Sequence, residues 1–534
     1  MTRFANRLYS AAAKAGRPVR RTAALLRRRR ATRLLIAPQD IRVDDPVVAS
    51  DFANGSFPLV DKRIDTAGGS PFLVNPPSEA WSAALHGFEW LRHFRSASKV
   101  ERAAAAELVR IWTLEARAMD VGARTAFRPD VVARRVISWL SHSPLVLENA
   151  EPAAYETFLR AVERDAVALE DVLAEKHDGF LRLQASIALQ YAGLALDNSE
   201  GRLEFASRRA GRELKRWISP VGDALDRNPA TAIALLLDLL PLRQAFKARG
   251  LEPPAILVDS VPRLLAGVRR LRHFNGDVAL FNGMGETPTG DLAAIFAHAG
   301  RSDETWLDDS EPGYARLEGG ATTVLADFGP MPTFEFALEP FEGCLSFEFS
   351  DGAERVIVNC GAPPAGVAFV EALRTARTTF AHSAPYLDAG VAAYGRTRRI
   401  KVERRSAEGE ESGSHDGFAA ASGYAVRRAL SLSADGRALR GLDSLELKRK
   451  LVRPNMGICA NFHLHASVKA ELQAAGSVTL TLPSGAAWLF FADSGRVTLE
   501  ASDFFASSVG PRKTSRINLA VEGHEAHWAL TKIV

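Results

Sequence analysis

The sequence predicts a multidomain α+β protein, in which an N-terminal incomplete (α/α) toroid of helical hairpins precedes a C-terminal antiparallel β-sandwich. Three observations lead to this fold class. The chain has 534 residues, more than a single hydrophobic core usually serves. Apolar residues recur at helical spacing between about residues 80 and 300. Beyond about residue 310 they alternate with polar residues, as in strands.

Six segments of the first half place apolar residues three and four positions apart, which is the pattern of an amphipathic helix. Short breaks such as FRPD, KHDG and GLEPP separate them. Helices paired in this way bury their inner faces against each other, so we expect a layer or toroid of hairpins. The segments are EAWSAALHGFEWLRHF, VERAAAAELVRIWTLEARAM, DVVARRVISWLSHSPLVL, AAYETFLRAVERDAVALEDVLAE, LRLQASIALQYAGLAL and PATAIALLLDLLPLRQAFKARG.

The second half contains short alternating runs such as CLSFEFS, RVIVNCG and SVTLTLP. Turn pairs such as Asp351-Gly352 and Asp435-Gly436 separate several of them. Because no long helix intervenes, we expect an antiparallel β-sandwich or stacked sheets. The predicted regions are a basic N-terminal arm over residues 1–45, the helical toroid over residues 46–305 and the β-sandwich over residues 306–534.

The net charge of +4 conceals an uneven distribution. Residues 1–33 contain eleven Lys and Arg and no acidic residue, so the remaining chain has 56 basic and 63 acidic residues. A polyanionic partner is therefore expected only at this segment, which fits a basic helix or arm that contacts anionic lipid at a membrane. A solvated tail without a specific partner is the alternative. We expect no nucleic-acid partner.

The N-terminal segment does not fit a secretory signal, because LYSAAA is too short for an apolar core and TAALL runs directly into RRRR. No stretch reaches the roughly 18 apolar residues of a transmembrane helix. These features predict a cytoplasmic or membrane-peripheral location. The three cysteines match no zinc or redox spacing, so no disulfide framework is expected.

Several motifs occur in order along residues 80–520. They include LHGFEWLRHF, DRNPATAIALLLDLLPLRQAF, ALFNGMGE, RTTFAHSAPYLD and GPRKTSRINL. Together they resemble the heparinase II/III-like family of polysaccharide lyases, and most closely its uncharacterised bacterial branch. The resemblance implies cleavage of a uronic-acid-containing acidic glycan by β-elimination. It also implies the periplasm as the alternative location.

β-Elimination sets three tasks for the site. A hydrogen-bond donor such as Asn or Arg must reduce the negative charge of the uronate carboxylate. A base must then remove the proton on the adjacent carbon, and an acid must protonate the departing glycosidic oxygen. His has a suitable pKa for these steps, as has a Tyr activated by its surroundings. The expected site residues are therefore Asn, His and Tyr in the cleft between the two domains.

The DRNP motif supplies the first candidate. By the family resemblance, Asn228 matches the carboxylate-binding asparagine, and Arg227 beside it adds positive charge for substrate binding. Alternatively, Asp226 or Asn228 simply caps the helix that Pro229 opens. Relatives often carry a DGGHxSRNP pattern, whereas this chain has VGDALDRNP, with Ala224 in place of the histidine. If that histidine serves the chemistry, this chain has lost it.

Further candidates come from the β domain and the link before it. His382 matches the histidine of the family's AHS motif, although a lone histidine at a strand end is often structural. Tyr314 is a candidate proton donor or base, with packing at the domain junction as the alternative. Asn282 and Glu286 in FNGMGE, together with Arg377, are candidates for binding the substrate.

Four residues are candidate metal ligands, namely His415 and Asp416 in SHDGF and His463 and His465 in FHLH. These residue types suit zinc, and the resemblance implies that some relatives hold a structural zinc with similar ligands. His463 and His465 project from the same face of a strand because they lie two positions apart. An exposed or half-buried histidine pair is the alternative. The reaction itself requires no cofactor.

The leading interpretation is a polysaccharide lyase. The alternative is a glycan-binding or cell-envelope assembly protein that keeps the lyase architecture without turnover, and Ala224 favours it. An open cleft that gathers Asn228, His382 and Tyr314 would indicate the enzyme, whereas burial of His382 would indicate the binding protein. A glycoside hydrolase would need two carboxylates in the cleft, and the sequence reveals no such pair. The mildly acidic main body argues against a densely sulfated substrate.

Overall fold

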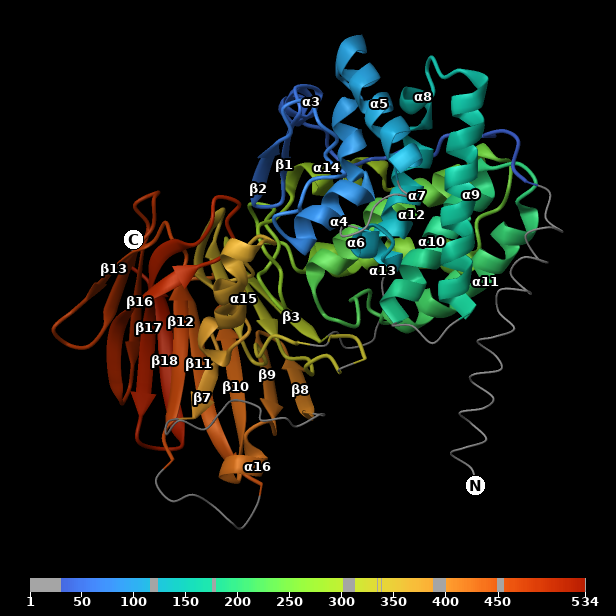
Figure 1. Ribbon diagram of the computed structural model, residues 1–534. Helices are drawn as coiled ribbons and strands as arrows, with labels where there is room; N and C mark the ends of the chain where they lie inside the picture. The colour runs from blue at the N-terminus through green and yellow to red at the C-terminus, as the bar shows by residue number, and fades with distance from the viewer. Residues whose placement is uncertain are drawn as a thin grey trace, which may run out of the picture.

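In the computed structural model, helices and strands occupy two regions that meet along one side (Figure 1). The fold class predicted from the sequence is confirmed, since helices that pack on one another precede two stacked antiparallel sheets. The last helix of the first region ends at His298 and the first strand of the second begins at Tyr314. The structure describes residues 30–115, 123–174, 179–300, 313–333, 335–337, 339–387, 400–448 and 456–533.

The helical region places two long and largely buried helices, α10 and α12, in the centre and its amphipathic helices around them. The helices are α3 (Pro46–Ala53), α4 (Glu79–Gly87), α5 (Lys99–Glu115), α6 (Ala123–Ala126), α7 (Pro129–Ser141), α8 (Ser143–Val146), α9 (Pro152–Ala174), α10 (Gly179–Ala195), α11 (Glu200–Trp217), α12 (Pro229–Ala248), α13 (Ala255–Arg270) and α14 (Thr289–His298), with a 3-10 turn η1 (Glu89–Phe94).

Within the described part of the chain, α12 is the one helix that is long and apolar enough to cross a membrane. Its most apolar window is 72% buried inside the protein. Burial of this kind is typical of the core helix of a folded domain, and the packing of α12 against α10 and α13 accounts for its composition.

The described part of the predicted basic arm, residues 30–45, packs on the helices. Thr32 donates hydrogen bonds to the Asp197 carboxylate, and Arg42 is buried with its guanidinium 2.8 Å from Asp238 on α12. A small hairpin that the sequence did not predict follows α3, with strands β1 (Ser56–Leu59) and β2 (Lys62–Asp65). The remainder of the arm, residues 1–29, lies outside the described residues.

The strands form two sheets whose neighbours are all antiparallel, in the orders β13-β14-β15-β18-β11-β10-β9-β8 and β16-β17-β12-β6-β5-β4-β3, with β7 paired to β12. The strands are β3 (Tyr314–Gly319), β4 (Thr322–Asp327), β5 (Phe347–Asp351), β6 (Glu354–Val358), β7 (Pro385–Leu387), β8 (Val402–Ala407), β9 (Glu410–His415), β10 (Tyr424–Leu432), β11 (Ala438–Leu447), β12 (Ile458–Leu464), β13 (Lys469–Leu472), β14 (Val478–Thr481), β15 (Ala487–Ala492), β16 (Arg496–Phe504), β17 (Arg512–Val521) and β18 (Glu525–Lys532). Short helices η3 (Val367–Phe369), α15 (Val370–Ala376), η4 (Thr379–Ala381) and α16 (Ala419–Ser422) connect some of them.

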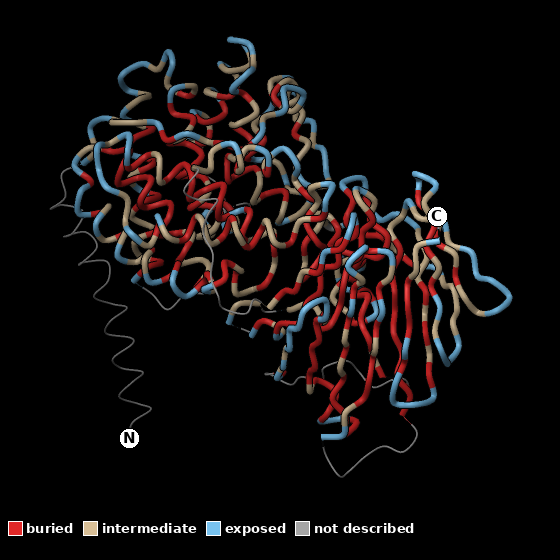
Figure 2. Tube along the Cα trace, turned by 180° about the vertical axis from the view of Figure 1, so that it is seen from behind, coloured by how far each residue is buried: buried red, intermediate tan, exposed pale blue. Residues whose placement is uncertain are grey.

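Buried residues run through the middle of both regions and through their junction (Figure 2). Aromatic side chains fill the space between the two sheets, where Phe347 stacks on Trp528 with ring centroids 5.5 Å apart. Arg428 is also buried there, and its guanidinium donates to both oxygens of Asp443. A buried charge is tolerated when it is paired and hydrogen-bonded in this way.

Glu348 on β5 links the two regions. Its carboxylate accepts hydrogen bonds from His273 and from the Leu280 amide of the helical region, and from Arg355 on β6. Burial alone would raise the pKa of Glu348, but Arg355 and the hydrogen bond from His273 outweigh burial and lower the pKa to about 2. The junction is therefore held by fully desolvated charged contacts, and it carries the cavity described next.

Candidate functional site

A cavity of about 450 Å³ opens where the helical region meets the β-sandwich. Four segments contribute its walls, namely the turn before α12, the FNGMGE segment, the β4–β5 loop and the residue after α15. The lining residues are Asp226, Asn228, Asn282, Pro332, Phe336, Ala337, Glu339, Pro340, Phe341 and Arg377. Three of the residues predicted for the site, Asn228, Asn282 and Arg377, are therefore brought together here.

Asn228 serves both of the roles that the sequence left open. It is the N-cap of α12, where its Oδ1 accepts a hydrogen bond from the Ala230 amide at 2.9 Å and Pro229 occupies the first helical position. Its Nδ2 makes no hydrogen bond to any described residue, and it lies 3.1 Å from where a Cβ on Gly283 would stand. The cap thus fixes the side chain and leaves its amide donor available to the cavity.

Arg227 turns away from the cavity and into the domain junction. Its backbone is left-handed, with φ +59°, a conformation that is strained for a residue with a side chain. Its guanidinium donates to Asp327 at 2.6 Å and lies 4.4 Å from the centroid of the Tyr314 ring. Burial alone would lower the pKa of Arg227, but the charge of Asp327 outweighs burial and raises it. Arg227 therefore joins the domains and does not line the cavity.

Tyr314 lies beside Arg227 and is 1% exposed. Its hydroxyl donates to the Arg227 carbonyl and accepts from Asn282 Nδ2 at 2.8 Å, while its ring stacks on Phe281. Burial raises the pKa of Tyr314 above its ordinary value. The hydroxyl is thus occupied within the junction, which corresponds to the packing role that the sequence left as the alternative.

The two residues predicted in the FNGMGE segment lie in different surroundings. Asn282 lines the cavity, although its Nδ2 is held by Tyr314 and by Asp327 at 2.7 Å. Glu286 does not line it and accepts a hydrogen bond from the Ser508 amide, which ties this segment to the sandwich. Glu286 is therefore a domain contact in this structure.

Arg377 brings positive charge to the cavity wall. Its Nη1 donates to Glu339, and its guanidinium carbon lies 5.9 Å from the centroid of the Phe341 ring. Its Nε is buried and has no hydrogen-bond partner in the described part of the chain. A buried donor without a partner is costly, so this nitrogen is a point at which an anionic or hydroxyl group of a ligand would be stabilised.

His382 is 2% exposed and does not line the cavity. Neither ring nitrogen has a hydrogen-bond partner among the described residues, and burial lowers its pKa to about 4. The ring of Phe341, 6.4 Å away between centroids, packs against it on the side of Gly343. Because the AHS motif predicted a cleft-facing histidine, its burial is the main difference between expectation and structure.

The β4–β5 loop causes this burial. Its Phe336 packs on Trp217 of α11 with ring centroids 5.1 Å apart, and its Phe341 contacts both His382 and the space above Gly283. A Cβ on Gly283 would come within 2.6 Å of the Phe341 ring, so only glycine permits this approach. The loop is thus anchored by two aromatic side chains, and Phe341 both lines the cavity and packs against His382.

Asp226 was predicted only as a helix cap, yet it lines the cavity beside Asn228. Its Oδ1 accepts from the Asn228 amide at 3.1 Å and its Oδ2 from the Thr231 hydroxyl. Burial raises its pKa to about 6, against the effect of these hydrogen bonds. The cavity therefore contains one carboxyl group with a raised pKa, Asp226, and a second carboxyl group, Glu339, that accepts from Arg377.

The four predicted metal ligands do not come together. His463 donates from Nε2 to the Phe380 carbonyl and is hydrogen-bonded through Nδ1 to Ser502, and His465 contacts Ser467. His415 lies on β9, in the other sheet, and accepts from the Gly417 amide. Asp416 accepts from the Lys401 amide. Among the residues that the structure describes, no group of three or more His, Cys, Asp or Glu is placed to hold a metal. The two motifs lie on different sheets, so the structure does not bring the predicted ligands together.

The arrangement of helices followed by two stacked sheets defines a protein with the fold of the polysaccharide lyases of the heparinase III type. The chain is similar to a crystal structure of heparinase III, with a TM-score of 0.70 and 13% identity over 95% of this chain and 87% of that chain. It is also similar to the heparan sulfate lyase HepC from Pedobacter heparinus, with a TM-score of 0.61 and 14% identity over 92% of this chain and 84% of that one.

Residues 304–529 match the family model described as Heparinase II/III-like, C-terminal. The resemblance drawn from the sequence is thereby confirmed. Among curated proteins, the FtsZ-localized protein C of Caulobacter vibrioides (strain NA1000 / CB15N) is 25% identical over 93% of this chain and 89% of its own length. That relative carries a name that describes a location and not a reaction.

Proposed function

We propose that this chain binds an acidic glycan in the cavity between its two domains and does not cleave it, acting as a cell-envelope assembly protein built on a lyase fold. One observation carries the proposal. The predicted proton-transfer groups do not reach the cavity, because His382 is 2% exposed and does not line it, and the Tyr314 hydroxyl is held by Arg227 and Asn282. Binding groups remain at the cavity without the predicted acid and base.

The chemistry of the cavity supports a carboxylate-bearing sugar. Asn228 Nδ2 and Arg377 Nε are donors without a partner among the residues that the structure describes, and two such donors suit the oxygens of a uronate. Phe336 and Phe341 offer apolar faces for a sugar ring. Because Asp226 and Glu339 add negative charge to the same walls, a densely sulfated polymer would be repelled.

The curated relative supports the non-catalytic part of the proposal. Its name describes a protein localized with FtsZ, and the similarity extends over most of this chain and most of the relative. We place the present protein at the cytoplasmic side of the envelope, where the basic residues 1–33 would contact anionic lipid. Its glycan would then be an intracellular or newly made one, not an imported polysaccharide.

Binding of uronate oligosaccharides tests the proposal. Titration calorimetry with oligosaccharides of hyaluronan, alginate and polygalacturonate would be run on the parent and on Asn228→Ser. Serine keeps a capping oxygen for α12 but removes the amide donor, so the fold is retained while affinity falls about tenfold or more. Arg377→Gln is expected to have a similar effect.

Arg374→Gln is the matched control, because Arg374 lies one turn earlier on α15, is 71% exposed and does not line the cavity. Its affinity should equal that of the parent. Equal losses in Arg374→Gln and Arg377→Gln would mean that general charge, and not the cavity, determines binding. Failure of every acidic oligosaccharide to bind the parent would exclude the proposal.

A lyase remains the second candidate, and the position of Asp226 favours it. A base with a pKa of about 6 beside an amide donor matches the first two tasks of β-elimination. The base would take the proton next to the carboxylate, the bond to the glycosidic oxygen would break as a carbon–carbon double bond forms, and the departing oxygen would take up a proton. Ultraviolet absorbance of the unsaturated product distinguishes this candidate from simple binding.

A further inference from the structure

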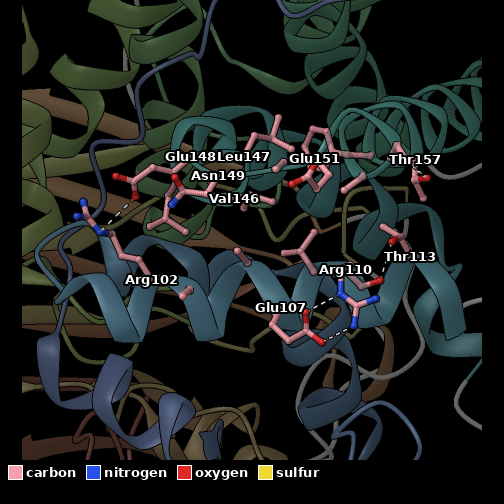
Figure 3. A pocket seen from close by; sticks show the side chains of 18 of the residues that line it. Arg102, Glu107, Arg110, Thr113, Val146, Leu147, Glu148, Asn149, Glu151 and Thr157 are labelled. Atoms are coloured by element: carbon pink, nitrogen blue, oxygen red, sulfur yellow. Dashed lines mark hydrogen bonds and ion pairs between the residues drawn. The ribbon is translucent and has the colours of Figure 1, made fainter.

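A second cavity lies entirely within the helical region and is separate from the proposed glycan site (Figure 3). Its volume is about 590 Å³, and it lies between α5 and the segment that joins α8 to α9. None of the predicted site residues lines it. Figure 1 places these helices at the edge of the helical region that is away from the strands.

The floor of this groove is apolar. Ala103, Ala106 and Val109 contribute from α5, and Ala154 and Phe158 contribute from α9. Ala103 is exposed and Ala106 and Ala154 are half-buried, whereas Val109 and Phe158 are buried, so the alanines form the accessible part of the floor. The surface therefore fits an apolar face better than a sugar or a nucleotide.

The two banks of the groove carry opposite charge. On α5, Lys99, Arg102 and Arg110 outnumber Glu107, which is paired with Arg110. The facing bank carries Glu148 and Glu151. Arg102 Nε and Glu148 Oε2 face each other across one end at 3.9 Å, and Arg110 pairs with Glu107 on the same helix (Figure 3).

We propose that this groove docks an amphipathic α-helix of a partner protein, with an apolar face, one acidic flank and one basic flank. The lining residues of α5 run from Lys99 to Leu114, which corresponds to roughly 22 Å or about four helical turns. Such a length suits the helix-in-groove mode, in which residues at i, i+3, i+4 and i+7 enter the groove. The acidic flank would face α5 and the basic flank would face Glu148 and Glu151.

A groove of this size would bury less than a standard protein interface, so micromolar affinity is expected. The probe is a synthetic 15-residue helical peptide, about four turns long, with leucines on one face, Glu on one flank and Lys on the other. The comparison peptide has the same leucines but Glu on both flanks. Fluorescence anisotropy measures both affinities on the full chain, and hydrogen exchange locates the peptide.

The parent chain should bind the peptide with one acidic and one basic flank at least fivefold more tightly than the all-acidic peptide. The double variant Glu148→Lys/Glu151→Lys makes both banks basic and should reverse this preference. The matched control Glu156→Lys/Glu204→Lys has the same change in net charge at exposed residues that do not line the groove, and it should keep the preference of the parent.

Additional protection from exchange on adding the peptide should appear in residues 99–114 and 145–158. Three results would overturn the proposal: equal affinity for both peptides, added protection located elsewhere, or no binding of either peptide at about 1 mM. Dimerisation of the free chain that the peptide reverses would also overturn it, since a second copy would then be the occupant of the groove. Because the groove and the glycan cavity share no lining residue, neither proposal depends on the other.

Discussion

Arg227 Nη2 and Asp327 Oδ1 lie 2.6 Å apart and form a buried ion pair between the turn before α12 and strand β4. The pair is one residue away from Asn228, so it positions the cavity wall as well as joining the two domains. Asn282 Nδ2 donates a hydrogen bond of 2.7 Å to the second oxygen of this carboxylate, Asp327 Oδ2. The stability of the junction and the shape of the cavity are thus set by the same group of contacts.

Asp327→Asn should destabilise the junction, because it leaves the Arg227 charge buried without a counter-charge. Breaking a buried pair in this way costs about 3 to 5 kcal/mol. Urea unfolding followed by fluorescence measures the loss. The control is Glu371→Gln, which breaks an ion pair between exposed side chains and should change stability by less than about 1 kcal/mol. Equal small effects in both variants would show that the pair does not hold the domains together.

Phe341→Ala should expose His382. Removal of the phenyl ring admits water to the two imidazole nitrogens of His382, which have no partner among the described residues. The His382 pKa should then rise from about 4 toward an ordinary histidine value. Titration of the imidazole signals by NMR measures this change, with His382→Ala to assign the signal. An unchanged titration in Phe341→Ala would mean that Phe341 does not control access to His382.

Asp226→Asn should alter how stability depends on pH. Because the folded-state pKa of Asp226 is raised from 3.8 to about 6, its favourable contribution is full below the unfolded value and is lost as the pH rises through about 6. The variant has no such loss, so its stability relative to the parent should improve by about 1 to 3 kcal/mol between pH 4 and pH 8. Denaturant unfolding at the two pH values measures it. A constant difference would contradict the shifted pKa.

Treatment with a chelator should leave the melting temperature unchanged. His415, Asp416, His463 and His465 lie apart in the structure, and His463 is already engaged by Ser502 and the Phe380 carbonyl. Calorimetry before and after dialysis against a chelator, together with elemental analysis for zinc, makes the measurement. One equivalent of zinc per chain, with a lower melting temperature after its removal, would restore the zinc hypothesis.

The fold could be predicted because its patterns are local. Helical periodicity up to about residue 300 and strand alternation after about residue 310 depend on residues close in the sequence. The hairpin of β1 and β2 was missed because its strands are four residues each and one of them is largely exposed, so it has little apolar alternation. The packing of residues 30–45 was missed because it depends on distant partners such as Asp197 and Asp238.

The site was less predictable for a related reason. Asn228 and Arg377 were found because motif resemblance marks the loops that meet at the junction. The burial of His382 depends on Phe341, which lies 41 positions earlier on a loop without a motif. Asp226 was treated as a helix cap, since its raised pKa results from burial by other segments. Residue types predicted the chemistry that is available, and tertiary packing decided which groups reach the cavity.

The central claim is that the chain binds an acidic glycan without cleaving it. The most direct test offers acidic polysaccharides to the purified full chain and follows the ultraviolet absorbance of an unsaturated uronate, with calorimetry on the same samples and with His382→Ala and Asp226→Asn alongside. The account predicts binding that Asn228→Ser weakens and a flat absorbance for parent and variants alike. Rising absorbance in the parent that is lost in His382→Ala or Asp226→Asn would contradict the account and establish a lyase.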